Sequence, residues 1–146
     1  MNRDILLQVK IIENYVSRLL DESAKSFGIS GAEARALKAL ENIIKKKDKA
    51  YAKDLEIHLN LKRSSICELI NTMEKHDLII RHAPDGDDLR HKEITLTERG
   101  KEISKQTRKR IKGYNDEIEA LFSKEEINEL KNKLDSVIDY LASKGE

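Results

Sequence analysis

Residues 52–100 read AKDLEIHLNLKRSSICELINTMEKHDLIIRHAPDGDDLRHKEITLTERG, and the spacing of apolar residues changes within this stretch. Helical spacing predicts a short helix over 52–59 and, after a turn at 60–61, a second helix that ends near residue 76. Helical spacing stops at residue 78, and residues 78–82 and 92–96 fit two strands. Residues 83–88 include a proline, a glycine and three aspartates, so we expect a turn there and a hairpin with a polar tip.

A short helix, a tight turn and a second helix together form a helix-turn-helix arrangement. The second helix can enter the major groove of DNA if its inner face is apolar and its outer N-terminal face carries short polar and basic groups. Ile66, Ile70 and Met73 supply the apolar face. The residues that we expect to face DNA are Lys62, Arg63, Ser64, Ser65 and Glu68.

Each type of residue on the outer face can make a different contact with DNA. Arg63 can donate two hydrogen bonds to a guanine, and the hydroxyls of Ser64 and Ser65 can bond a base edge or a phosphate. Glu68 either accepts a hydrogen bond from a cytosine amino group or repels phosphate and weakens binding. The sequence leaves these two roles of Glu68 open.

The hairpin tip supplies a second set of candidate DNA contacts. Arg90, His91 and Lys92 follow the acidic turn, and an arginine in such a loop can enter the minor groove. We expect Asp88 to pair with Arg90 and orient it; the alternative is a solvated turn without a role in binding. The spacing of the aspartates does not fit a calcium-binding loop.

Amphipathic helices are expected on both sides of this central stretch. Apolar residues recur from Ile5 to Leu19, and a second helix after residue 30 is expected to fray into a solvated loop at 45–49. A long helix after residue 97 carries apolar positions from Ile103 to Leu121. In the last helix, the positions expected to face inward are Ile127, Leu130, Leu134, Ile138 and Leu141.

The chain has 146 residues, of which 38% are apolar and 38% charged, as expected for one domain with long exposed helices. Residues 62–112 carry 13 Lys/Arg and 9 Asp/Glu, so the basic part is central although the net charge is only +1. We predict a mainly α fold with a small β-hairpin wing. Its winged helix-turn-helix region is 31–103, with the wing at about 78–97, and its helical dimerisation region is 1–30 and 104–146, because the apolar faces at both ends need a partner.

Several classes of protein are disfavoured. The sequence has no catalytic motif and its four histidines lack metal-ligand spacing, so we expect no enzyme, cofactor or metal site. We also see no signal peptide or membrane span and expect a cytoplasmic protein. The single cysteine, Cys67, cannot form an intramolecular disulfide; it is either a small half-buried residue or a thiol whose oxidation disrupts binding.

Segment 51–103 resembles the MarR family of bacterial and archaeal transcription regulators. The resemblance rests on Ala52-x-x-Leu55, Ser64-Ser65-Ile66, Met73-Glu74 leading into Leu78-Ile-x-Arg81, and Asp88-x-Arg90 followed by Ile94-x-Leu96-Thr97-x-x-Gly100. The sequence departs from the family pattern at Lys62, Glu68, Asp77 and Leu89.

The resemblance implies a homodimeric, sequence-specific regulator of transcription that binds double-stranded DNA at a pseudo-palindromic operator. It implies a repressor that a small aromatic effector releases, with a ligand pocket between the first, second and fifth helices. We expect Tyr15, Leu19, Phe27 and Tyr51 to line that pocket. The alternative is a helical adaptor whose winged domain binds an acidic protein partner in place of DNA.

Overall fold

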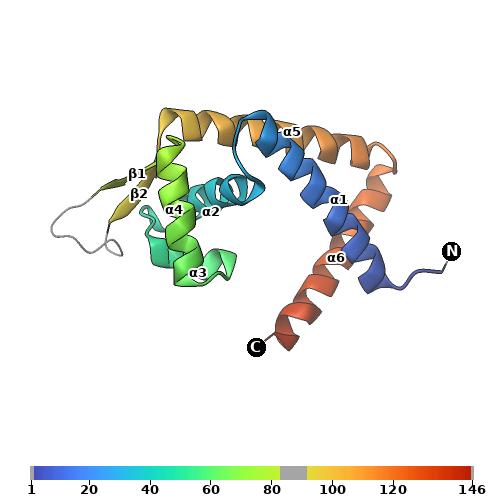
Figure 1. Cartoon of the computed structure of the whole chain (residues 1–146). Coiled ribbons are helices and arrows are strands. Elements are labelled where there is room, and N and C mark those ends of the chain that lie inside the picture. Colours follow the sequence, from blue (N-terminus) through green and yellow to red (C-terminus); the bar gives the residue numbers. More distant parts are fainter. Residues whose placement is uncertain (1, 83–91, 146) are drawn as a thin grey trace. The chain divides into compact units, whose positions relative to one another are not determined.

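The computed structural model describes residues 2–82 and 92–145, and its elements follow the predicted order (Figure 1). They are α1 (Ile5–Ser26), α2 (Gly31–Lys47), α3 (Ala52–Leu59), α4 (Arg63–Lys75), β1 (Ile79–His82), β2 (Glu93–Leu96), α5 (Glu98–Glu119) and α6 (Lys124–Lys144). The predicted class, mainly α with a small hairpin wing, is confirmed. The chain divides within α5 into two compact units, Met1–Thr107 and Arg108–Glu146.

The hydrophobic core of the first unit is built around α2, which contacts α1, α3, α4 and β2. Its fully buried apolar side chains come from the helices and the hairpin alike, and Ile66, Ile70 and Met73 among them form the predicted inner face of α4. They include Leu37, Leu40, Leu55, Ile66, Ile70, Met73, Leu78 and Ile94. Burial of the apolar face of α4 in this core fixes which of its side chains point outward.

Local side-chain bonds set the helix boundaries. At the start of α2 the Glu33 N–H donates to the Ser30 hydroxyl (3.1 Å) and the Ser30 N–H donates to the Glu33 carboxylate (3.0 Å), which completes a capping box. The same pair of bonds joins Ser123 and Glu126 at the start of α6, and the backbone bond from Ser123 lowers the pKa of Glu126. After the C-terminal end of α4, Asp77 has a positive φ (55°), in the left-handed region that often ends a helix.

The hairpin is antiparallel, with Ile79 opposite Leu96 and His82 opposite Glu93. The Ile94 N–H also donates to the Ala50 carbonyl (2.8 Å), which ties β2 to the segment just before α3. This third backbone segment was not predicted, because a single residue in a bridge has no sequence pattern of its own. It fixes the hairpin against the helix-turn-helix unit.

The junction between β2 and α5 leaves no room for a side chain at Gly100. Thr97 begins the helix as expected: its hydroxyl accepts from the Gly100 N–H (3.0 Å) and donates to the Asp77 carbonyl (2.6 Å). A Cβ added at Gly100 would overlap the Leu78 carbonyl oxygen. Since the Thr97 N–H donates to that same oxygen (3.0 Å), the strand and the helix meet at backbone distance.

Two expectations about the flanking helices were wrong. The helix α2 continues to Lys47, where a loop over 45–49 was expected; lysine is a good helix former and is favourable near a helix C-terminus. The helix α5 ends at Glu119, so Leu121 lies beyond it and is 75% exposed. In α6 only Ile127 of the five positions expected to face inward is buried within the chain.

Apolar side chains on α1 and α6 remain exposed within a single chain. On α1 these include Ile5, Val9, Ile12 and Val16, and on α6 they are Leu130, Leu134, Ile138, Tyr140 and Leu141. Helical spacing indicated correctly that each helix has an apolar face. The exposure of these faces agrees with the expectation that they need a partner.

Candidate nucleic-acid interface

The helix α4 presents two chemically different faces. Ile66, Ile70 and Met73 are at most 1% exposed and hold the helix in the core. The structure brings four of the predicted DNA-facing residues together on the exposed face of the first two turns, namely Arg63, Ser64, Ser65 and Glu68. An α-helix with short polar and cationic groups at its exposed N-terminal end has the shape and the donors that a major groove accepts.

Lys62 occupies the N-cap of α4 in an extended conformation and is exposed. It makes no side-chain cap bond, in contrast to the serines that begin α2 and α6. An N-cap without a side-chain acceptor leaves helix N–H groups to another partner, and a phosphate oxygen is one that helix N-termini bind readily.

The C-terminal end of α4 is held by a network that sequence reasoning missed. The buried Glu33 carboxylate lies 2.7 Å from Nδ1 of His76, the C-cap of α4. Arg99 of α5 donates to the His76 carbonyl and to the Phe27 carbonyl (3.1 Å). The network therefore connects the ends of α1 and α4 to the starts of α2 and α5.

A second network holds α4 against the hairpin. Arg81 of β1 donates from Nε to the Glu74 carboxylate (2.9 Å) and from a terminal nitrogen to the Asn71 side-chain carbonyl (2.8 Å). The Arg81 side chain is only 13% exposed and the Glu74 side chain 33%, so this ion pair is partly buried. The family resemblance includes Glu74 and Arg81 as motif positions, but their spacing gives no sign that they pair.

The structure tests the predicted wing contacts only in part. Asp88, Arg90 and His91 lie outside the described residues, and their pairing and DNA contacts stay predictions. Lys92 is half-buried just before β2. The next residue, Glu93, lies 3.9 Å from the ammonium group of Lys49, so β2 starts beside a lysine that sequence reasoning had not assigned to the interface.

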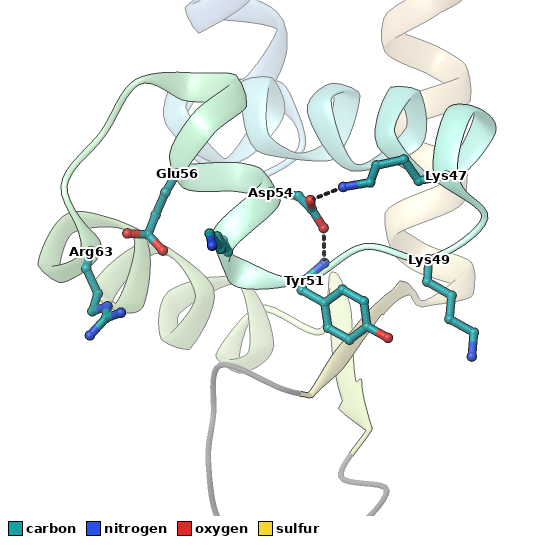
Figure 2. Close-up of a pocket in the computed structure, with 7 residues that line it drawn as sticks. Lys47, Lys49, Tyr51, Asp54, Glu56 and Arg63 are labelled. Carbon is teal, nitrogen blue, oxygen red and sulfur yellow. Dashed lines mark hydrogen bonds and ion pairs between the residues drawn. The ribbon is translucent and has the colours of Figure 1, made fainter.

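Tyr51 lines an open hollow of about 840 Å³ next to the start of α4 (Figure 2). The other lining residues are Lys47, Lys49, Lys53, Asp54, Glu56 and Arg63. The remaining three residues of the expected ligand pocket, all of them described, are not in this lining. Tyr15 is 62% exposed on α1, Leu19 is half-buried on α1, and Phe27 packs against the core at the end of α1.

Three expectations from the sequence concern other features of the described part of the chain: the cysteine, a metal site and a membrane span. Cys67 is half-buried on α4, between the buried and exposed faces. Across residues 2–82 and 92–145, His, Cys, Asp and Glu side chains form no group of three or more placed to hold a metal ion. Within the same ranges, no helix is both long enough and apolar enough to cross a bilayer.

The sequence matches no protein-family model and no curated protein, but the fold is similar to solved structures of transcription regulators. A complex of Staphylococcus aureus MepR with DNA has a TM-score of 0.78 at 19% identity, over 96% of this chain and 99% of that chain. MepR, described as a transcription regulator of the multidrug efflux pump MepA of that organism, gives 0.75 at 19% identity, over 95% and 99%. MarR from Oenococcus oeni gives 0.66 at 24% identity, over 93% and 99%. The chain therefore has the winged helix-turn-helix fold of the MarR-type transcription regulators.

Proposed function

We propose that this chain is a sequence-specific DNA-binding regulator of transcription. The observation that carries the proposal is the exposed face of α4, where Arg63, Ser64, Ser65 and Glu68 stand together while the opposite face is locked in the core. The fold shared with MepR, for which a DNA complex has been solved, supports the same conclusion.

Specificity would come from the first two turns of α4. A bidentate contact from Arg63 to guanine contributes about 1–3 kcal/mol of discrimination against other bases. Glu68 lies one turn further along and would accept from a cytosine amino group. The two serines allow the backbone to approach closely and supply hydroxyls for a base edge or a phosphate.

We further propose that the functional unit is a homodimer. The exposed apolar faces of α1 and α6 support this, since contiguous apolar surface on a chain commonly marks an interface with another chain. Two copies related by a two-fold axis would place their α4 helices at half-sites roughly 34–36 Å apart, which requires a pseudo-palindromic operator. The domain assignment, a dimerisation region at 1–30 and 104–146 beside a DNA-binding region at 31–103, belongs to this proposal.

Repression, and release of the DNA by a small aromatic effector, form the finer part of the proposal and rest on the family resemblance alone. Titration of the protein–DNA complex with a simple phenolic acid at constant pH and ionic strength tests the release. A fall in DNA affinity that saturates with the phenolic acid supports it, and an unchanged affinity contradicts it.

Fluorescence anisotropy with a labelled duplex from the region upstream of the gene tests DNA binding itself. We expect the logarithm of the association constant to fall linearly with the logarithm of salt concentration, because phosphate contacts release counterions. Arg63→Ala should lose about 1–3 kcal/mol on this duplex. Lys75→Gln, which removes one exposed charge at the opposite end of α4, is the matched control and should bind nearly as the parent does.

An absence of binding to the upstream duplex at low salt would contradict the proposed function. In that case the winged domain is better explained as an adaptor for an acidic protein partner. Equal losses for the Arg63 and Lys75 variants would instead show that α4 contributes charge but reads no base.

A further inference from the structure

The hollow shown in Figure 2 lies where three parts of the first unit meet. The end of α2 contributes Lys47, the following turn contributes Lys49 and Tyr51, and α3 contributes Lys53. Arg63, the first residue of α4, closes the set. Arg63 therefore belongs both to the exposed face of α4 and to the lining of the hollow, so the two surfaces adjoin.

The described residues that line the hollow are predominantly positive. Among them, Asp54 and Glu56 carry carboxylates and four side chains are cationic. Asp54 is 13% exposed and already holds two donors, the Lys47 ammonium (2.7 Å) and the Tyr51 N–H (2.9 Å), as Figure 2 shows. Its negative charge is therefore largely compensated within the protein.

The cations at Lys49, Lys53 and Arg63 are less engaged. The Lys49 side chain is 60% exposed and its nearest carboxylate, that of Glu93, is 3.9 Å away, at the limit for an ion pair. Lys53 and Arg63 are exposed and have no ion-pair partner among residues 2–82 and 92–145. An anion that enters the hollow thus meets cations that need not break a strong internal bond.

We propose that this hollow holds the phosphate backbone of the DNA segment that flanks the groove read by α4, with Lys49 and Lys53 as its phosphate contacts. The inference rests on the proposed function. Arg63 fixes the geometry: when it reaches a base edge in the major groove, the surface beside it must pass along the groove's phosphate edge. The Tyr51 hydroxyl adds a neutral donor of the kind that also contacts phosphates.

The shape of the hollow favours an extended polyanion over a small anionic ligand. Small-molecule sites are enclosed, mostly apolar, and bury most of the ligand surface. Here the lining is dominated by charged side chains, and Lys47 and Lys49 remain more than half exposed. Exposed lysines beside a recognition helix can follow a DNA strand without enclosing it.

Phosphate contacts do not distinguish one base from another. The hollow should therefore contribute to the affinity for any DNA, whereas the exposed face of α4 should also set the sequence preference. Removal of the charges at Lys49 and Lys53 should weaken binding to every DNA sequence by the same factor and make binding less dependent on salt. Removal of the Arg63 side chain should also reduce the preference for the operator.

The test is a salt series on the full-length Lys49→Gln/Lys53→Gln variant with the upstream duplex and a shuffled duplex. Each phosphate that the variant no longer neutralises should make the slope of log association constant against log salt less steep by about 0.9, so by about 1.8 per protomer. The ratio of the two affinities should stay constant. Lys38→Gln/Lys75→Gln removes the same charge from exposed positions outside the hollow and should keep the parent slope. Thermal melts check that both variants fold.

The outcomes separate the two proposals. If the parent protein binds the upstream duplex but the Lys49→Gln/Lys53→Gln variant keeps its slope, the hollow does not contact DNA and the proposed function stands. If the parent protein binds no DNA, both proposals fail. A loss of affinity that is confined to the upstream duplex and spares the shuffled duplex would show that Lys49 and Lys53 discriminate between sequences, and would overturn the inference.

Discussion

Replacement of Gly100 by alanine tests how the wing is joined to the helices. A Cβ at this position would overlap the Leu78 carbonyl oxygen and lie 3.2 Å from its carbonyl carbon. Overpacking of this kind costs about 1–3 kcal/mol. Displacement of the carbonyl also weakens the bond that it accepts from the Thr97 N–H (3.0 Å), which contributes about 1 kcal/mol. The higher helix propensity of alanine returns about 1 kcal/mol.

The net expectation for Gly100→Ala is a loss of about 1–3 kcal/mol in the free energy of unfolding. For a chain of 146 residues this corresponds to a fall in Tm of about 3–10 °C. Gly113→Ala is the control, because Gly113 lies in the same helix and a Cβ there meets nothing within 4 Å. It should raise stability by about 0.5–1 kcal/mol.

Urea denaturation followed by circular dichroism, at one fixed protein concentration, measures both variants. The concentration must be fixed because the stability of a dimer depends on it. The midpoint should move down for Gly100→Ala and up for Gly113→Ala with a similar m-value. If the two variants were equally stable, the close approach of α5 to β1 would not limit the residue at 100, and the reasoning would be refuted.

Three further substitutions test the contact between Glu33 and His76, the proposed dimer and the exposed face of α4. Glu33→Ala removes the cap of α2 and the side chain that contacts His76, the C-cap of α4. In a urea titration it should lower the free energy of unfolding by about 2–3 kcal/mol. The control Arg35→Ala, at an exposed position, should change that free energy by less than about 0.5 kcal/mol. Leu134→Asp places a charge on the apolar face of α6 and should convert the proposed dimer to a monomer, as measured by light scattering at micromolar concentration. The control Lys133→Ala should not. A parent protein that is already monomeric would contradict the proposed dimer. Glu68→Gln should reduce the ratio of operator to shuffled-duplex affinity about tenfold, and a rise in that ratio would assign Glu68 a purely repulsive role.

The order and type of the elements could be predicted because local chemistry decides them. Residues 52–59 have apolar positions at helical spacing, and α3 begins and ends at these residues. The Ser30–Glu33 and Ser123–Glu126 pairs mark helix starts, because a serine followed three residues later by a glutamate is a pattern that can be found in the sequence itself.

The contacts that position α4 could not be predicted in this way. His76 and Glu33 are 43 residues apart, and neither has a pattern that distinguishes a buried side-chain contact from an exposed polar residue. Lys49 was expected in a solvated loop and Lys53 in a short helix, and neither pattern shows that both residues line a hollow together with Arg63. For α1 and α6, the spacing predicts that each helix has an apolar face that needs a partner, but it does not identify that partner.

The central claim is that α4 reads the major groove, and dimethyl sulfate protection on the upstream duplex tests it most directly, because the reagent methylates guanine N7 in that groove. We predict protected guanines in two tracts roughly 34–36 Å apart along the helix axis, one for each protomer. The protection should disappear with Arg63→Ala and persist with Lys75→Gln. Binding that leaves every guanine N7 reactive, or protection that survives Arg63→Ala unchanged, would contradict the claim.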